Sequence, residues 1–289
     1  MTSVIKRAIT TDGSVRIFFA DTTQMVQEGA SIHGTSKTCT AVLGRVLTAT
    51  ALMGCMLKDK DQSLTLQFKG GGPAGSVICV SDYKGNCRGY VEHPEVELPA
   101  NGQGKLDVGG AIGRNGLLYV MKHMGKGEPY VGVSRLVSGE VGDDITHYFA
   151  ESEQTPTVCA LGVRVADDLH VKAAGGFLVQ LMPGTEEAVI DQLEKNLAGI
   201  DSVSALIAAG QSGEEIVAQV MQNLEFEWFD EFDIGYVCDC GEERYRKALL
   251  SLPEADRKEL LASDEPLVTT CRFCGKRYTF DAKELYGAH

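Results

Sequence analysis

Four of the nine cysteines lie close together near the C-terminal end, within 37 of the 289 residues. Cys238 and Cys240 form a CxC pair, and Cys271 and Cys274 form a CxxC pair after a separation of thirty residues. Two such pairs can turn four thiolates toward one tetrahedral ion, and four cysteines are a common ligand set of structural zinc. The spacing therefore predicts one Zn²⁺ bound by these four side chains.

The CxC pair differs from the two CxxC pairs that most zinc ribbons use. Sulfurs on residues so close in sequence are sterically tight, so a disulfide between Cys238 and Cys240 is strained and easily reduced. This spacing indicates a site that is taken apart as well as assembled.

The charge of the chain argues against nucleic acid as a partner. The formal net charge is −13, and residues 225–289 carry 15 Asp and Glu against 9 Lys and Arg, a local net charge of −6. Binding to a phosphate backbone needs clustered Lys and Arg. A nucleic-acid-binding zinc ribbon remains an alternative, which salt-dependent binding of RNA or DNA would support.

Enzyme classes are also disfavoured by the motifs. A catalytic zinc site keeps one coordination position open, whereas four cysteines close the site. A thiol–disulfide oxidoreductase using Cys271 and Cys274 is a further alternative, but its CxxC normally opens a helix in a βαβ unit, and Cys238 and Cys240 would be unused. Residues 70–75 match GxGxxG, yet a strand follows them, so we interpret them as a turn and expect no enzyme.

The first twelve residues are polar, and no run reaches the roughly 18 apolar residues of a membrane span. Nine cysteines, an odd number, argue against a secreted disulfide framework. We therefore expect a cytoplasmic protein with reduced thiols and no membrane partner.

Residues 1–184 are predicted to form an α+β domain with a mixed or antiparallel sheet and at least two helices. Residues 36–57 are rich in small residues at helical spacing, which predicts a buried helix. Alternating patterns predict strands, two of which flank a hairpin turn at residues 82–86. The predicted strands cover residues 14–20, 63–68, 77–81, 87–91, 117–122, 130–136 and 171–182.

Cysteines elsewhere are interpreted as packing residues. Cys39 and Cys55 lie on the predicted small-residue helix, where a thiol acts as a small hydrophobic group. Cys79 and Cys87 lie on the two arms of the predicted hairpin, and no other feature supports a functional disulfide between them.

Residues 185–236 are predicted to form a helical, metastable linker. Helices are expected at residues 186–200, 202–209 and 215–224, the last with a capping box from Ser212 to Glu215. Isolated helices of this length are marginal in water, so they need an apolar neighbour. Residues 225–236 then place Trp228 among three Phe and five acids. This composition predicts an amphipathic linker that is poised between a state docked on a neighbouring surface and a loose one.

Residues 237–289 are predicted to form a small zinc-binding domain. Helices are expected at residues 244–252 and 253–262 and a short strand at residues 278–280. About fifty residues bury little core of their own, and zinc contributes about 10–16 kcal/mol to the folding of small zinc peptides. Without the metal, this end of the chain is expected to unfold.

The whole chain resembles the redox-regulated holdase chaperones of the heat-shock protein 33 family. The CxC and CxxC pairs at this separation are the specific part of the resemblance, together with Tyr278 and Phe280 after the last cysteine. Gly241 stands where a serine is common in the family, but it is not a ligand position. Further matching segments are residues 43–45 with 48–49, 85–86 with 88–90, 104–109, 152–156, 173–177 and 243–244.

The resemblance implies a chaperone that is inactive when reduced and zinc-bound. It implies that oxidation forms the disulfides Cys238–Cys240 and Cys271–Cys274, releases zinc and unfolds the linker, so that unfolding client proteins are bound without ATP. Dimerisation of the oxidised form is implied as well. The client-binding surface cannot be read from the sequence, because an adaptable apolar surface leaves no motif.

Overall fold

The computed structural model describes residues 2–263 and 265–286, and the chain divides into two compact units. The first unit is Met1–Val237 and the second is Cys238–His289. Each unit is described by itself below. Among the described residues, no helix is long and apolar enough to cross a membrane.

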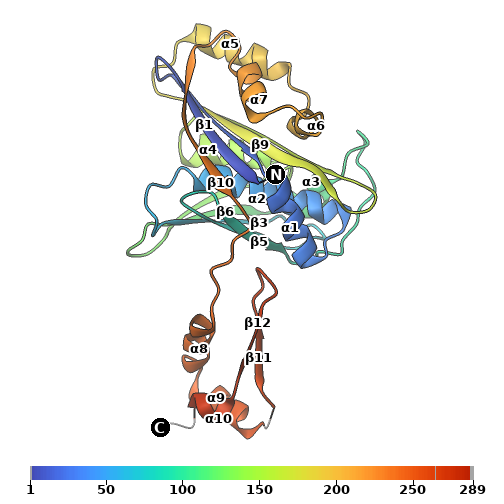
Figure 1. The fold of residues 1–289 in the computed structure, drawn as a ribbon, viewed down its shortest axis with the longest axis vertical. Helices are drawn as coiled ribbons and strands as arrows, with labels where there is room; N and C mark the ends of the chain where they lie inside the picture. The colour runs from blue at the N-terminus through green and yellow to red at the C-terminus, as the bar shows by residue number, and fades with distance from the viewer. Residues whose placement is uncertain (1, 264, 287–289) are drawn as a thin grey trace. The chain divides into compact units, whose positions relative to one another are not determined.

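One five-stranded antiparallel sheet of the first unit, which we call the linker-side sheet, has the strand order β10-β1-β2-β9-β8 (Figure 1). β9 is buried along nearly its whole length, as expected for a strand that is covered on both faces. The strands of this sheet are β1 (Ser3–Thr10), β2 (Val15–Asp21), β8 (Thr157–Val165), β9 (Val171–Leu181) and β10 (Phe226–Ile234).

The second sheet of this unit is also five-stranded and antiparallel, with the order β5-β4-β3-β6-β7. The hairpin predicted around residues 82–86 is present, and residues 70–75 form a turn between β3 and β4, as predicted. The strands are β3 (Ser63–Lys69), β4 (Val77–Asp82), β5 (Cys87–Val91), β6 (Leu117–His123) and β7 (Tyr130–Arg135).

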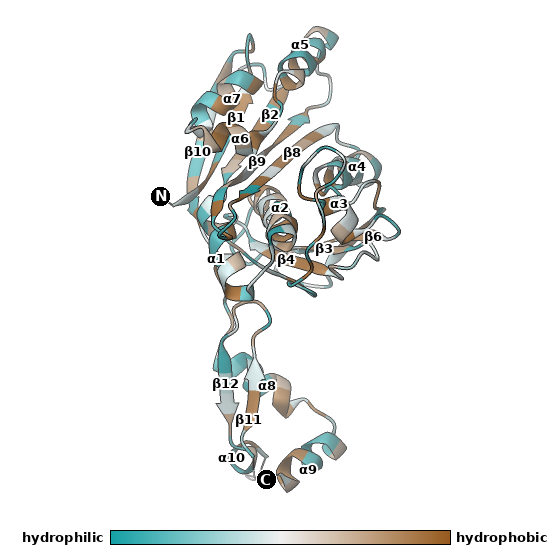
Figure 2. Ribbon diagram, turned by 90° about the vertical axis from the view of Figure 1, so that its right-hand side faces the viewer, coloured by the Kyte–Doolittle hydropathy of each residue, from teal (hydrophilic) through white to brown (hydrophobic). Residues whose placement is uncertain are grey.

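Helix α2 (Lys37–Gly54) lies between the two sheets and contacts strands of both (Figure 2). Its small residues permit this close packing: a Cβ on Gly44 would lie 2.7 Å from a methyl of Val26, and one on Gly54 would lie 2.1 Å from the hydroxyl of Ser81. The other helices of this layer are α1 (Thr23–His33), α3 (Val108–Ile112) and α4 (Gly142–Ser152). The predicted buried helix is therefore the centre of the core.

Three short helices cover the outer face of the linker-side sheet (Figure 1): α5 (Glu187–Ala198), α6 (Val203–Ala208) and α7 (Gly213–Val220). The capping box predicted for the third helix is present, because the Ser212 hydroxyl accepts from the Glu215 amide at 3.2 Å while the Glu215 carboxylate accepts from the Ser212 amide at 2.8 Å. The apolar residues of these helices pack on Ile17, Phe19 and Phe177. The helices thus obtain from the sheet the burial that they lack alone.

The segment after these helices differs from the sequence prediction. Residues 225–236 read as an amphipathic linker, but β10 occupies most of them and pairs with β1 from Ser3↔Ile234 to Thr10↔Phe226. Strand β1 itself lies in the polar N-terminal stretch where no strand was expected. β1 mostly alternates in burial, whereas β10 is an edge strand with most of its residues exposed, so its acidic side chains can face water.

The end of the first unit is attached to β5. The Cys87 amide donates to the Gly235 carbonyl at 3.0 Å, and the Val237 amide donates to the Cys87 carbonyl at 2.8 Å. The buried Tyr236 hydroxyl donates to the Gly89 carbonyl at 2.6 Å. Cys238, the first cysteine of the CxC pair, follows directly after this anchored segment.

The second unit contains α8 (Glu242–Leu250), α9 (Glu254–Ala262), the hairpin strands β11 (Leu267–Thr270) and β12 (Arg277–Phe280), and α10 (Ala282–Tyr286). Helices α8 and α9 match the predicted segments, but neither contains a buried residue. The buried side chains among the described residues of this unit are Cys271, Tyr278, Phe280, Ala282 and Leu285. The unit therefore has a very small core.

Candidate metal centre

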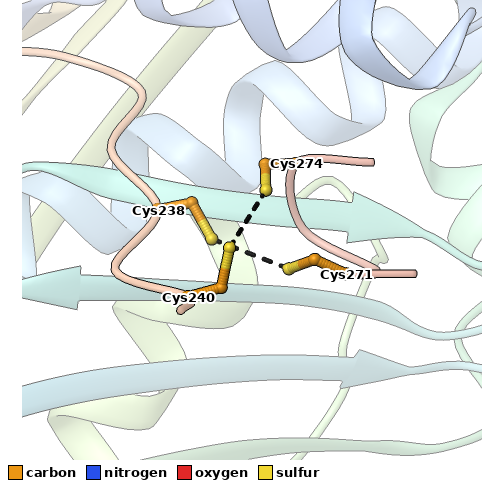
Figure 3. A group of neighbouring side chains, drawn as sticks. All are labelled: Cys238, Cys240, Cys271 and Cys274. Atoms are coloured by element: carbon orange, nitrogen blue, oxygen red, sulfur yellow. Dashed lines mark hydrogen bonds between the residues drawn. The ribbon is translucent and has the colours of Figure 1, made fainter. Parts of the chain in front are cut away.

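The four cysteines of the CxC and CxxC pairs come together in the second unit (Figure 3). All four sulfur atoms lie within 4.8 Å of one another; Cys238 Sγ is 3.7 Å from Cys271 Sγ, and Cys240 Sγ is 3.3 Å from Cys274 Sγ. Tetrahedral zinc with Zn–S bonds of about 2.3 Å places its sulfurs about 3.8 Å apart. The donor set and its spacing therefore fit a metal ion bound by four thiolates.

Local backbone geometry brings each pair to the site. Cys238 and Cys240 lie in the extended segment just before α8. Cys271 and Cys274 lie in the turn between β11 and β12, where the Cys271 amide donates to the Lys276 carbonyl and the Gly275 amide donates to the Cys271 carbonyl, both at 2.9 Å. Gly275 has φ +70°, a left-handed conformation that glycine adopts without strain.

The position of the CxxC pair argues against a thiol–disulfide oxidoreductase. The CxxC of a thiol–disulfide oxidoreductase opens a helix after a strand, whereas here it joins two antiparallel strands. The helix that begins near the site, α8, follows the CxC pair instead. This arrangement favours metal binding over an oxidoreductase active site.

Cys271 and Cys238 differ in acidity. Burial opposes ionisation of Cys271, but the Tyr245 hydroxyl and the amides of Cys274 and Phe273 bond to its sulfur and lower its pKa to about 6. Burial raises the pKa of Cys238, and hydrogen bonds with the neighbouring sulfurs raise it further. The hydrogen bond from the Cys240 amide has the opposite effect but is outweighed. The thiolate is the form that binds metal, so the metal-free site holds Cys271 largely as a thiolate at pH 7.

Two tyrosines contact the sulfurs. The Tyr278 hydroxyl donates to Cys240 Sγ at 3.1 Å, and the Tyr245 hydroxyl bonds to Cys271. Sequence reasoning placed Tyr278 on a strand and Tyr245 on a helix, but it assigned neither to the site. The sequence signals were position, with Tyr245 five residues after Cys240 and Tyr278 four residues after Cys274, and for Tyr278 also the family resemblance.

The remaining five cysteines, Cys39, Cys55, Cys79, Cys87 and Cys159, are buried free thiols in the first unit. Burial raises the pKa of Cys55, Cys87 and Cys159 to about 12. Cys79 lies opposite Gly89 on the neighbouring strand, and Cys87 lies opposite Ser81. These thiols pack as small hydrophobic groups, as predicted for Cys39 and Cys55.

A second surface of interest is the face of the linker-side sheet under α5–α7. Ile17, Phe19, Phe177 and Val179 form this face, and each is at most 1% exposed. The sequence did not identify it, although residues 17–20 of β2 and 173–179 of β9 are runs without a polar side chain, which is typical of strands covered on both sides. Removal of the helices would expose a large apolar area.

Comparisons with known proteins agree over the whole chain. The family model described as Hsp33 protein matches residues 3–281. The 33 kDa chaperonin of Clostridioides difficile is 43% identical over 285 residues, which cover 99% of this chain and 98% of that protein. The 33 kDa chaperonin of Ruminiclostridium cellulolyticum is 44% identical over 285 residues, with 99% and 97% covered.

The likeness extends to a solved structure. The crystal structure of the 33 kDa chaperonin of Thermotoga maritima, a heat shock protein 33 homolog, superposes with a TM-score of 0.91 at 34% identity and covers 99% of this chain and 97% of that one. The α+β architecture, the four-cysteine cluster and the full-length matches agree, so this chain belongs to the Hsp33 family of chaperones.

Proposed function

We propose that this chain is a redox-regulated, ATP-independent holdase that binds unfolding or oxidatively damaged proteins and prevents their aggregation. One observation carries the proposal: four free thiols meet within 4.8 Å in a unit that buries only five of its described side chains. Folding of such a unit depends on what the four sulfurs bind, so their chemistry can act as a switch. The family membership supplies the chaperone activity.

In the reduced state, Cys238, Cys240, Cys271 and Cys274 are the proposed ligands of one Zn²⁺. When bound, the ion would hold the four sulfurs as thiolates and supply the folding free energy that the small core lacks. An oxidant such as peroxide removes two electrons from each pair of thiols, and one S–S bond forms per pair. The proposed disulfides are Cys238–Cys240 and Cys271–Cys274.

The proposed response of the first unit is loss of its linker, residues 185–236. Helices α5–α7 are short, and their apolar side chains are buried against the sheet face that includes Ile17, Phe19 and Phe177. Release of these helices would expose that face, and an apolar surface of this kind binds partly folded chains without a defined motif. We propose this face, with the released helices, as the client-binding surface.

Client proteins are the partners that family membership implies. We further propose that the oxidised form is a homodimer and that the protein acts in the cytoplasm. Analytical ultracentrifugation of reduced and oxidised protein tests the first point. A monomer in both states at micromolar concentration contradicts it.

The main test is light scattering of a client protein that unfolds on heating. The chain is added either reduced and zinc-loaded or oxidised and metal-free. Suppression of aggregation by the oxidised form alone is the expected result. Equal suppression by both forms would show a constitutive chaperone, and suppression by neither form would remove the holdase proposal.

The order of oxidation is tested by mass mapping of partly oxidised protein. We expect Cys271–Cys274 to form first, because a CxxC disulfide is less strained than a CxC disulfide. All four sulfurs are within 4.8 Å, so disulfides between the two pairs are the competing products. Cys238–Cys240 forming alone and first contradicts the proposed order.

Trp228 reports on the linker. It lies on β10, is 44% exposed, and its ring contacts Phe226 edge-on at 5.7 Å between centroids. Oxidation is expected to change its fluorescence and to raise the protease sensitivity of residues 185–236. A linker that keeps both properties on oxidation is not part of the switch.

A further inference from the structure

The two tyrosines at the four-cysteine site serve different cysteine pairs. The Tyr278 hydroxyl donates to Cys240 of the CxC pair at 3.1 Å. The Tyr245 hydroxyl bonds to Cys271 of the CxxC pair. Each pair therefore contains one sulfur that accepts a hydrogen bond from a phenol.

Packing holds the two hydroxyls in place. The rings of Tyr245 and Tyr278 are stacked, with centroids 4.9 Å apart and an interplanar angle of 28°. The Lys276 ammonium lies 5.3 Å from the centroid of the Tyr278 ring. Tyr278 is paired opposite Thr269 in the β11–β12 hairpin, and Tyr245 belongs to the first turn of α8. Protein groups alone thus fix the donors, which is the arrangement of partners that orient and tune metal ligands.

We propose that the hydroxyls of Tyr245 and Tyr278 are positioning groups that restrain the four-cysteine switch, slowing oxidation of Cys271 and Cys240 and strengthening metal retention. With zinc bound, the four sulfurs would already be thiolates, so a hydrogen bond no longer changes the thiolate fraction. It then draws electron density from the sulfur and lowers its nucleophilicity, and such bonds also stabilise the ligand set around a metal. The inference rests on the proposed redox function and deepens it, because it names the residues that set the oxidant threshold.

The reaction that the hydroxyls restrain is oxidation by a peroxide. A thiolate attacks one peroxide oxygen, the O–O bond breaks, and a sulfenic acid and hydroxide form. The second thiolate of the pair then attacks the sulfenic sulfur; the S–S bond forms, the S–O bond breaks, and a second hydroxide leaves. The two sulfurs lose two electrons, and the peroxide gains them. The tyrosines keep their protons and act only on the first attack.

The test uses the full-length, zinc-loaded protein and the substitutions Tyr278→Phe, Tyr245→Phe and both together. These changes keep the stacked rings and remove only the hydroxyls. The matched control is Tyr286→Phe in the same unit, because the Tyr286 hydroxyl donates to the Leu249 carbonyl at 3.0 Å instead of to a sulfur. Its removal costs a hydrogen bond but leaves the sulfurs as they are.

Three readouts are expected to change. Under peroxide, zinc release, followed with a colorimetric chelator, becomes several-fold faster in each single variant. Trapping of sulfenic acid with dimedone, followed by peptide mapping, shows an excess at Cys240 in Tyr278→Phe and at Cys271 in Tyr245→Phe. Competition with a chelator shows a loss of zinc affinity of about 10–100-fold, the usual effect of removing such a partner.

The outcomes separate this inference from the proposed function. Wild-type oxidation rates in both tyrosine variants, or the same acceleration in Tyr286→Phe, would overturn the restraint. A general acceleration without the site-specific shift in trapping would also overturn it, because a structural defect has that effect. None of these readouts measures client binding. A failed holdase assay would therefore reject the proposed function, while the effect of the two hydroxyls on sulfur oxidation and zinc affinity would be decided separately.

Discussion

The same residue type has two opposite roles in this chain, and its surroundings decide which one applies. Cys55, Cys87 and Cys159 are buried among apolar side chains, and burial raises their pKa to about 12. Cys271 receives hydrogen bonds from a tyrosine and from backbone amides, which outweigh burial and lower its pKa to about 6. Reactivity with oxidants follows the thiolate fraction, so these buried thiols of the first unit are poor candidates for the proposed redox chemistry.

Glu153, just after the end of α4, accepts two side-chain hydrogen bonds. It accepts from the Lys122 ammonium at 2.5 Å and from the Tyr148 hydroxyl at 2.6 Å. Burial alone would raise the pKa of its carboxyl above the ordinary value of 4.5, but these two bonds lower it below that value. Glu153 thus connects α4, which contains Tyr148, to β6, which contains Lys122.

Replacing Glu153 with Gln is expected to lower the free energy of unfolding at pH 7 by about 1.5–3 kcal/mol, the range for hydrogen bonds to charged groups. Because the carboxyl pKa is depressed in the folded state, its stabilisation is complete above the unfolded pKa and is lost as the pH falls through the folded pKa. The difference between wild type and variant should therefore shrink below pH 4.5. Urea unfolding at several pH values measures it.

The control for this substitution is Glu151→Gln. Glu151 lies on the same helix, is exposed, and pairs only across one turn with His147 at 3.3 Å. Removing this exposed pair should change the free energy of unfolding by less than about 1 kcal/mol. An Glu153→Gln variant as stable as this control at pH 7 would show that the Lys122–Glu153–Tyr148 contacts contribute nothing.

Among the secondary-structure elements, β10 shows how acidic residues can stabilise a strand. Arg7 on β1 donates twice to the Asp230 carboxylate, and its guanidinium lies over Phe232 at 5.2 Å from the ring centroid. Lys6 donates to Glu231 at 2.7 Å and to Glu214 of α7 at 2.5 Å. These ion pairs connect the edge strand and a linker helix to β1.

Arg7→Gln is expected to loosen β10, because it removes the charge that the two bonds to Asp230 require. We expect limited proteolysis with chymotrypsin to cut at Phe226 and Trp228 earlier than in wild type, and oxidation to release the linker more readily. Added salt should weaken the wild-type contact and narrow this difference, since exposed ion pairs are screened.

Lys37→Gln is the matched control. It removes an ion pair of 2.7 Å to the exposed Asp167, away from the linker. Exposed pairs contribute about 0–1 kcal/mol, so cleavage at residues 226–228 should stay at the wild-type rate. If both variants are cleaved alike, the Arg7–Asp230 contact does not hold β10.

The molecule as a whole combines two units with different sources of stability. The first unit buries a core that runs from α2 to both sheets, and a second apolar cluster under α5–α7. The second unit has two helices without a buried residue, and in the proposed mechanism its stability comes from the ion that the four sulfurs bind. A switch that acts on the sulfurs can therefore unfold one unit and leave most of the other intact.

Metal removal tests this division directly. Chelation of zinc from reduced protein is expected to abolish amide protection in residues 238–289, because about 10–16 kcal/mol of folding free energy leaves with the ion. Residues 1–184 should keep their protection in hydrogen exchange measured by mass spectrometry. Adding zinc back is the control, and it should restore the lost protection. Persistent protection of the second unit without metal would contradict the prediction.

Much of this protein follows from local sequence patterns. The spacing of Cys238, Cys240, Cys271 and Cys274 predicted the cluster that the structure contains, because the turns at each pair are local. The small-residue helix, the hairpin around residues 82–86 and the Ser212 capping box were predicted for the same reason. Each depends on residues that are near one another in sequence.

Contacts between distant segments were not predictable in this way. Strands β1 and β10 pair although Arg7 and Asp230 are 223 positions apart. The carboxylates that pair with Lys6 and Arg7 lie near these side chains only in the folded chain. The stacked Tyr245 and Tyr278 meet the sulfurs only when α8 and β12 come together. Local pattern determines which residues can bind a metal or form a strand, but pairing and burial arise from the folded chain, since they depend on neighbours that the sequence does not place side by side.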